Sequence, residues 1–263
     1  MTVIPQLLEL AVRTAEAAGR LLAEHHDSVL TIDTKTSVTD PVSEADRRSE
    51  HLITSQILDA RPDDGILGEE DAANRRGSSG IGWVIDPLDA TVNYLYGIPQ
   101  WCVSIAAEDD DGALVGVVHD PVKNETFTAA RGHGATRNGH GLEVTRVVDL
   151  GQTLVATGFA YDAAIRADQG RDLADLLPRV RDIRRAGSAA LDLAYVAAGR
   201  LDAYIEFGLQ PWDWAGGRLL VTEAGGRVTA HERTLGGRRR AGLVAGGPAA
   251  HDQLVAWLEG RRP

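Results

Sequence analysis

The chain has 263 residues, of which 43% are hydrophobic and 25% charged, a composition typical of a globular protein with a sizeable core. Its formal net charge of −11 argues against a nucleic-acid-binding surface, which requires a basic patch. No apolar run approaches the roughly 18 residues of a membrane-spanning helix, and no signal-peptide pattern opens the chain. The only cysteine, Cys102, is expected to be a buried core residue, which fits a cytoplasmic protein.

Two helices are expected before the first strand. Apolar residues at helical spacing predict the first helix from Pro5 to about His26. Ser43, with an acidic residue three positions later, predicts the N-cap of a second helix that ends near Ala60. A short strand, 66–68, should then lead into an acidic pair and a polar loop, 71–82.

The segment from Trp83 to Asn93 combines a strand with two carboxylates. The apolar run 83–86 predicts a central strand that ends at Asp86. Pro87 has no N–H to donate, so we expect it to stop sheet pairing and to turn the chain, which brings Asp89 back beside Asp86. Two crowded carboxylates repel each other unless a cation lies between them, and a hard divalent cation with oxygen ligands suits such a pair. A solvated acidic turn is the alternative.

Three strand-like runs follow this segment, at 101–108, 113–120 and 125–131, and predict consecutive antiparallel strands. The run from Asp109 to Gly112 predicts the first hairpin turn, and 137–141 predicts a later tight turn. The glycines of 132–137 suggest a dinucleotide-binding loop, but the third glycine and the following helix are missing, so we reject that interpretation.

From about residue 144 the pattern changes to alternating strands and helices. Strands are expected at 154–157, 180–184, 202–207 and 242–245, and helices at 162–177, 188–198, 213–224 and 249–260. The arginine run 238–240 is expected in a solvated loop. No linker divides the chain, which predicts a single domain, 1–263, with an antiparallel-rich half at about 1–143 and an α/β half at about 144–263.

Three segments together support a specific resemblance. They are Ile-Leu-Gly-Glu-Glu at 66–70, the pattern W-x-I-D-P-x-D-x-T-x-N at 83–93, and W-D-x-A-x-G at 212–217, which runs into Glu-Ala-Gly-Gly at 223–226. With them the chain resembles the inositol monophosphatase family of Mg²⁺-dependent, lithium-sensitive phosphatases. The segments 186–192 and 198–204 are similar to the inositol-phosphate branch of that family. The implied fold mixes α/β and α+β features in a layered α-β-α-β-α sandwich of the sugar-phosphatase type.

The resemblance implies a set of metal ligands. Glu69 and Asp86 would hold one Mg²⁺ together with the backbone carbonyl of Leu88, and Asp86, Asp89 and Asp213 would hold a second. The resemblance also allows a third, weaker ion near Glu69. The alternative for Asp213 is a purely structural role at the start of a helix, where an acidic side chain favours the positive end of the dipole.

The resemblance further implies that a metal-activated water attacks the phosphorus. Glu69 and Thr91 would position and deprotonate this water, and Asp46 would hydrogen-bond Thr91. The N–H groups of Ala90 and Thr91 suit phosphate binding. Most family members have glycine at position 90, and the alanine in this chain adds a methyl group beside the phosphate that is tolerated if its φ is negative.

The alcohol part of the substrate would contact Asp89, a backbone group at Ala189, Glu206 and Asp213 by the same resemblance. An ion pair at the surface is the alternative role of Glu206. Further residues are expected beside the ligands, where they would orient them; these are Glu70, Lys35 and Asp40.

The resemblance predicts a Mg²⁺-dependent phosphomonoesterase that hydrolyses myo-inositol 1-phosphate. Histidinol phosphate, fructose 1,6-bisphosphate and adenosine 3′,5′-bisphosphate are alternative substrates, because relatives that act on them share the metal ligands. Specificity should then lie in the loops 158–164 and 206–212. A binding or regulatory protein with an idle site is an alternative of a different class. The resemblance also implies a homodimer, inhibition by lithium and no organic cofactor.

Overall fold

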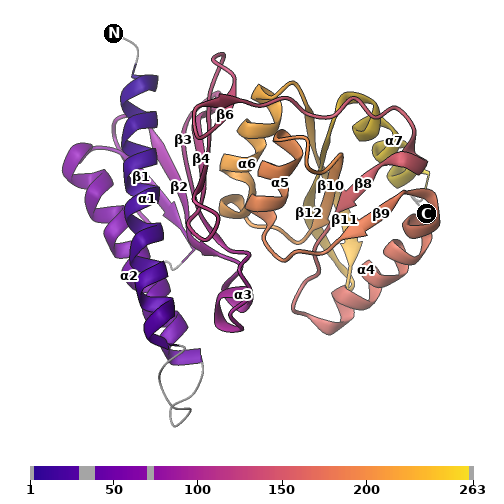
Figure 1. Cartoon of the computed structure of the whole chain (residues 1–263), viewed down its shortest axis with the longest axis horizontal. Helices are drawn as coiled ribbons and strands as arrows, with labels where there is room; N and C mark the ends of the chain where they lie inside the picture. Colours follow the sequence, from indigo (N-terminus) through magenta and orange to yellow (C-terminus); the bar gives the residue numbers. More distant parts are fainter. Residues whose placement is uncertain (1–2, 30–38, 70–73, 261–263) are drawn as a thin grey trace.

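The computed structural model describes residues 3–29, 39–69 and 74–260, and helices and sheets alternate in layers through this part of the chain (Figure 1). A seven-stranded sheet and a five-stranded sheet form the two β layers. Helices α1 and α2 cover the outer face of the first sheet, α5 and α6 lie between the sheets, and α4 and α7 cover the far side of the second sheet. The predicted α-β-α-β-α sandwich is therefore confirmed.

The outer helices α1 (Ile4–Val29) and α2 (Thr39–Ala60) pack on the first sheet through an apolar stripe. In α1 the stripe includes Leu7, Ala11, Ala15, Ala18 and Leu22, all fully buried. The prediction that Ser43 caps α2 is wrong, because the helix already begins at Thr39. A proline is tolerated in the first turn of a helix, so Pro41 does not delay the start.

The first sheet follows chain order from β1 to β7. Its strands are β1 (Gly65–Gly68), β2 (Gly82–Asp89), β3 (Cys102–Asp109), β4 (Gly112–Asp120), β5 (Glu125–Ala130), β6 (Ala135–Arg137) and β7 (His140–Gly141). The strands β1 and β2 are parallel, and every later pair is antiparallel. The three antiparallel strands and both hairpin turns are thus confirmed, whereas β2 is the second strand of the sheet and not a central one.

The prediction that Pro87 stops sheet pairing is also wrong. Asp86 pairs with Ser104, and pairing resumes at Asp89, which pairs with Cys102. Two residues of β2 therefore lie opposite one residue of β3, which defines a β-bulge. A bulge tolerates proline because the extra residues make no ladder hydrogen bond.

The second sheet has the order β11-β12-β10-β8-β9. Its strands are β8 (Leu154–Ala156), β9 (Asp182–Arg184), β10 (Ala203–Phe207), β11 (Arg227–Leu235) and β12 (Arg238–Gly246). The helices associated with this half are α4 (Ala163–Leu176), α5 (Ala189–Ala197), α6 (Pro211–Glu223) and α7 (Pro248–Glu259), while the short α3 (Thr91–Leu95) follows β2. The organisation as one domain with halves 1–143 and 144–263 stays a prediction.

The hairpin of β11 and β12 was not predicted in full. The arginines 238–240 belong to β12 and not to a loop, and β11 carried no prediction at all. Most side chains of β11 are exposed or only partly buried, so its sequence lacks the apolar alternation that indicates a strand. The chain reverses at Gly236 and Gly237, which both have positive φ angles.

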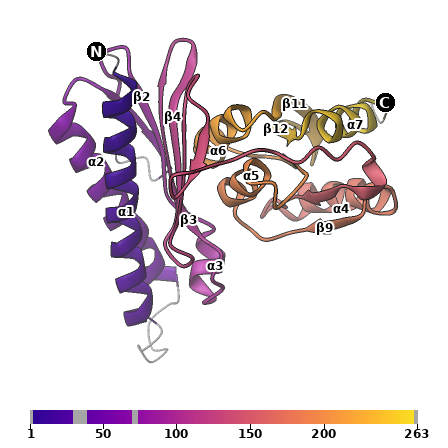
Figure 2. The ribbon, with the colours of Figure 1, turned by 45° about the horizontal axis from the view of Figure 1, so that its top comes forward.

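Figure 2 shows α1 and α2 on one face of the first sheet and α6 on the other. Helix α6 comes very close to the sheet where Gly116 of β4 meets Gly216 of α6. A Cβ atom on residue 116 would lie 2.6 Å from the carbonyl oxygen of Gly216. Within the described residues, none of the helices combines the length and the apolarity needed to cross a membrane.

We expect Gly116→Ala to lower the free energy of unfolding by about 1–3 kcal/mol, because α6 must move away from the sheet to admit the methyl group. Chemical denaturation measures this change. Gly170→Ala is the control, since a Cβ there meets nothing within 4 Å and alanine should raise the stability of α4 by about 0.5–1 kcal/mol. An unchanged stability of Gly116→Ala would contradict the close packing.

Candidate active site

Carboxylates from separate elements converge on one cavity of about 330 Å³ between the middle helices and the two sheets. Glu69 follows β1, Asp86 and Asp89 come from β2, Asp213 from α6 and Glu206 from β10. The lining also includes the predicted residues Leu88, Ala90, Thr91 and Ala189. The structure thus brings together most of the residues that the sequence singles out.

The bulge in β2 explains how two of these carboxylates reach the same cavity. Residues three apart on a regular strand point to opposite faces of the sheet. Asp86 and Asp89 instead pair with Ser104 and Cys102, which are two residues apart and therefore share a face. The extra residue of the bulge aims both carboxylates toward the middle helices.

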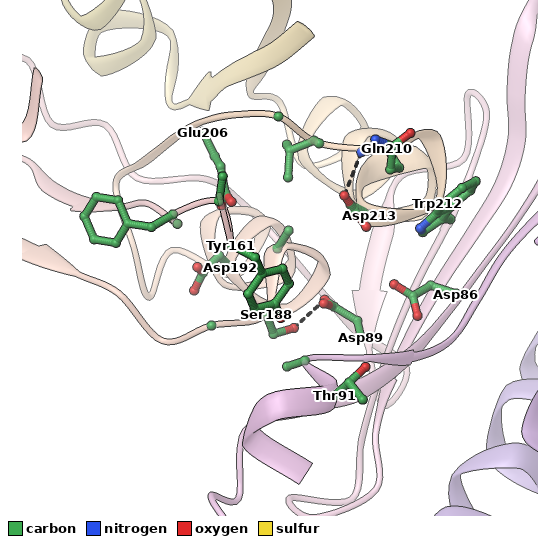
Figure 3. A pocket seen from close by; sticks show the side chains of 18 of the residues that line it. Asp86, Asp89, Thr91, Tyr161, Ser188, Asp192, Glu206, Gln210, Trp212 and Asp213 are labelled. Carbon is green, nitrogen blue, oxygen red and sulfur yellow. Dashed lines mark hydrogen bonds between the residues drawn. The ribbon is translucent and has the colours of Figure 1, made fainter. Parts of the chain in front are cut away.

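Asp89 is held by the start of α5. One of its carboxylate oxygens, Oδ2, accepts hydrogen bonds from the Ser188 hydroxyl at 2.6 Å and from the Ala190 N–H at 2.8 Å (Figure 3). The Cys102 thiol lies 3.8 Å from the same oxygen and is fully buried, as predicted. Burial raises the pKa of Asp89, although these hydrogen bonds oppose the increase.

Asp213 lies at the start of a helix and also lines the cavity. It is the third residue of α6, which begins at Pro211, and its Oδ2 accepts a hydrogen bond of 2.7 Å from the Gln210 N–H. This contact closes the first turn of the helix. The same side chain lines the cavity, and burial together with the charges of Asp89 and Glu69 raises its pKa to about 8.

Asp86 has the most crowded surroundings of the acidic cluster. Its Oδ1 accepts a hydrogen bond of 3.1 Å from the Leu88 N–H. Burial, followed by the charges of Asp89, Glu69, Asp213 and Asp46, raises its pKa well above the ordinary value. The buried Asp46 of α2 therefore lies within electrostatic reach of this cluster.

The turn after β2 places Ala90 and Thr91 on the cavity. Ala90 has a φ of +76°, so the condition of a negative φ, under which an alanine is readily tolerated, is not met. The left-handed region costs an alanine roughly 1–2 kcal/mol, because its Cβ approaches the carbonyl oxygen. The Thr91 hydroxyl donates a hydrogen bond of 3.2 Å to the Leu88 carbonyl, the carbonyl that the resemblance assigns to a metal ion.

The donor set suits a hard divalent cation, since carboxylate and carbonyl oxygens are the ligands that Mg²⁺ prefers. Within the described ranges, no three acidic, histidine or cysteine side chains already stand close enough to form a ready cage for an ion. The carboxylates nevertheless share one cavity, and the charges of Asp89 and Glu69 add to burial in raising the pKa values of Asp86 and Asp213, so a bound cation would relieve this repulsion. Lys35 and Glu70 lie outside the described residues, and Asp40 lies in the first turn of α2.

Glu206 lies at the other end of the cavity. Its Oε2 accepts a hydrogen bond of 2.8 Å from the Tyr204 hydroxyl, and burial raises its pKa to about 7. The carboxylate fits only because residue 158 is glycine, since a Cβ there would lie 2.1 Å from Oε2. No ion pair of Glu206 is among those in the described part of the chain, so the geometry favours a role in the cavity over a surface ion pair.

The sequence matches the model of the inositol monophosphatase family over residues 4–260. The chain belongs to this family. Inositol-1-monophosphatase SuhB of Mycobacterium tuberculosis is 43% identical over 257 residues, which cover 94% of this chain and 87% of the relative. Nus factor SuhB of Escherichia coli is 40% identical, with 95% of this chain and 94% of the relative covered. The structure of inositol monophosphatase from Anabaena is similar with a TM-score of 0.86 at 35% identity, over 100% of this chain and 98% of that chain.

Some residues that line the cavity carried no role in the sequence analysis. They are Asp192 on α5, the exposed Arg185 before it, and Tyr161 and Trp212 in the two loops expected to control specificity. Asp192 lies in a segment that resembles the family. Its place in the cavity becomes evident only from its burial near Glu206, and burial cannot be predicted from the residue type alone. Phosphatase activity follows from the family, whereas the role of each residue is part of the proposal below.

We expect Ala90→Gly to raise the free energy of unfolding by about 1 kcal/mol, because glycine adopts a positive φ without steric cost. The exposed Ala167 of α4 is the control: Ala167→Gly should lower stability by about 1 kcal/mol. Urea denaturation of both variants without added metal measures the pair. Equal destabilisation by both changes would show that residue 90 does not adopt the left-handed conformation.

Glu206 should make stability depend on pH. Its pKa is about 7 in the folded protein and near 4.5 in the unfolded chain, so folding favours the protonated form. The contribution of Glu206 to the free energy of unfolding is fully present below about pH 4.5 and disappears as the pH rises through about 7. Relative to Glu206→Gln, the wild type should therefore lose on the order of 2–3 kcal/mol between these pH values. Chemical denaturation with chelator present measures the free energy of unfolding at each pH. Glu9→Gln, at an exposed position, is the control and should show the same pH dependence of stability as the wild type.

Proposed function

We propose that this chain is a Mg²⁺-dependent phosphomonoesterase that acts on myo-inositol 1-phosphate. The observation that carries the proposal is the cavity with two acidic ends, one formed by Asp86, Asp89 and Asp213 and the other by Glu206. The first end suits cations that attract a phosphate. The second end offers hydrogen-bond acceptors to the hydroxyls of a polyol.

Glu69, Asp86, Asp89, Asp213 and the carbonyl of Leu88 would hold the ions in this proposal. Mg²⁺, when bound, supplies the positive charge that attracts the phosphate and acidifies the attacking water. One carboxylate oxygen of Asp89 accepts hydrogen bonds from the start of α5, and one carboxylate oxygen of Asp213 accepts a hydrogen bond from Gln210. These contacts fix the direction of the other oxygen in each carboxylate. This preorganisation lowers the cost of assembling the site.

Thr91 and Glu69 are the residues that we assign to the proton of the attacking water. The hydroxyl of Thr91 lies 3.2 Å from the Leu88 carbonyl and lines the cavity, which places it beside the proposed ligands. Glu69 is exposed at the end of β1 and faces the same cavity, so it can accept the proton. Asp46, buried near Asp86, would orient Thr91.

Two observations support inositol phosphate as the substrate. The relatives from Mycobacterium tuberculosis and Anabaena carry the name inositol monophosphatase. Ala189 and Glu206 line the cavity, as a polyol-binding role requires. The alternative phosphates of the sequence analysis share the metal chemistry, and the loops 158–161 and 207–212 on the cavity wall would decide among them.

The proposal also covers the oligomeric state of the enzyme and its inhibition by lithium. We propose that the enzyme is a homodimer inhibited by lithium; membership of the family supports both expectations, and both are tested in solution on the purified protein. A regulatory protein with an idle site is the rival interpretation. The four acidic ligands are present and line one cavity, which favours catalysis over an idle site.

We expect Asp86→Asn to lower phosphate release from myo-inositol 1-phosphate at least about 100-fold, because a metal ligand at the centre of the cluster is lost. The assay compares the four candidate phosphates with Mg²⁺ and with chelator. Asp59→Asn, at an exposed position of α2, is the control and should keep full activity. The replacement removes a repelled charge, so the metal-free variant should be at least as stable as the wild type.

Activity that persists in chelator would contradict the metal-dependent mechanism. Mg²⁺-dependent activity that is highest on another phosphate ester would contradict the proposed substrate, although the proposed metal-dependent mechanism would still hold. Mg²⁺ should raise the melting temperature of the wild type and not that of Asp86→Asn, which separates metal binding from turnover.

A further inference from the structure

Asp192 is a buried carboxylate that the proposed mechanism does not use. It lies in the first turn of α5, only 2% of its surface is exposed, and its side chain lines the cavity. Among the described residues its Oδ1 has no hydrogen-bond partner. A buried polar atom without a partner is rare in folded proteins, and on the wall of a cavity a ligand can supply the missing donor.

Asp192 and Glu206 form one acidic wall. Both carboxylates line the same cavity, and after burial the charge of Glu206 is the strongest effect that raises the pKa of Asp192. Figure 3 shows both on the side of the cavity away from Asp86 and Trp212. Tyr204 occupies one oxygen of Glu206, and Gly158 leaves the space in which that carboxylate sits.

The start of α5 ties this wall to the phosphate end. Asp89 accepts hydrogen bonds from Ser188 and Ala190, and the Asp192 N–H donates to the Ser188 carbonyl at 3.0 Å. A single helical turn therefore sets the position of Asp192 relative to Asp89. A substrate with its phosphate near Asp89 would present the far side of its alcohol to Asp192.

The chemistry of the wall selects the ligand group. Carboxylate oxygens accept hydrogen bonds, so they repel a second phosphate and require donors. Arg185 lines the same cavity and lowers the pKa values of both Asp192 and Glu206, so positive charge is already present near the wall. The remaining requirement is for neutral donors, which hydroxyl groups satisfy.

We propose that Asp192 is a substrate-binding residue that accepts hydrogen bonds from hydroxyls of the alcohol part, jointly with Glu206. Asp192 then adds to the preference for polyhydroxylated substrates that the proposed function already assigns to Glu206. This inference rests on the proposed phosphatase function and extends it to a further substrate-binding residue.

The test compares kcat/KM for myo-inositol 1-phosphate and for cyclohexyl phosphate, a ring of the same size without hydroxyls, in the presence of Mg²⁺. The wild type should prefer the inositol ester at least about 100-fold, because a site built to bind hydroxyls rejects an analogue that lacks them. Asp192→Ala, which removes the acceptor oxygens, should lose at least about 10-fold on the inositol ester and change less than about 2-fold on cyclohexyl phosphate. Asp59→Asn should change neither value.

Asp192→Ser is made in parallel, so that a folding failure of one variant leaves the other to decide, and thermal unfolding checks both. Equal losses on the two esters, no loss on either, or a wild type without preference would overturn the role of Asp192 and leave the phosphatase function standing. A wild type that hydrolyses no phosphate ester with Mg²⁺ would overturn the proposed function, and this inference with it.

Discussion

Repulsion among buried carboxylates is the constraint on which the arrangement of the site depends. Burial raises the pKa values of Asp86, Asp89 and Asp213, and the charge of Asp89 adds to this effect at Asp86 and Asp213. Each is held by at least one backbone N–H, from Leu88, Ala190 and Gln210 in turn. These hydrogen bonds keep the carboxylates in place without cancelling their negative charge, so the site still attracts a cation.

The layered fold supplies those backbone donors from different directions. The bulge of β2 aims Asp86 and Asp89 at the middle layer, where α5 and α6 begin beside the cavity. The close contact of Gly116 and Gly216 holds α6 near the first sheet, and thereby holds Asp213 near Asp86. Packing behind the cavity wall thus controls the distance between carboxylates, and that distance sets how strongly the site attracts a cation.

The local motifs allowed much of the site to be predicted from the sequence. The Ser188 cap of α5 and the hairpin at Asp109–Gly112 depend on neighbouring residues, and the structure confirms both as structural features. The strand predicted at 83–86 is also present, although it continues to Asp89. The convergence of Glu69, Asp86, Asp89 and Asp213 on one cavity came from the family resemblance. Composition and periodicity alone left a solvated acidic turn as an equal alternative.

Features that depend on distant partners could not be predicted in the same way. The bulge at Pro87 exists because β3 continues to pair beyond it, and β11 exists because β12 offers an edge to a largely exposed segment. The positive φ of Ala90 follows from the same cause: the bulge fixes the direction in which β2 ends, and α3 must begin immediately afterwards. A residue that is poorly suited to its backbone conformation therefore marks the place where the requirements of the site outweigh local preference.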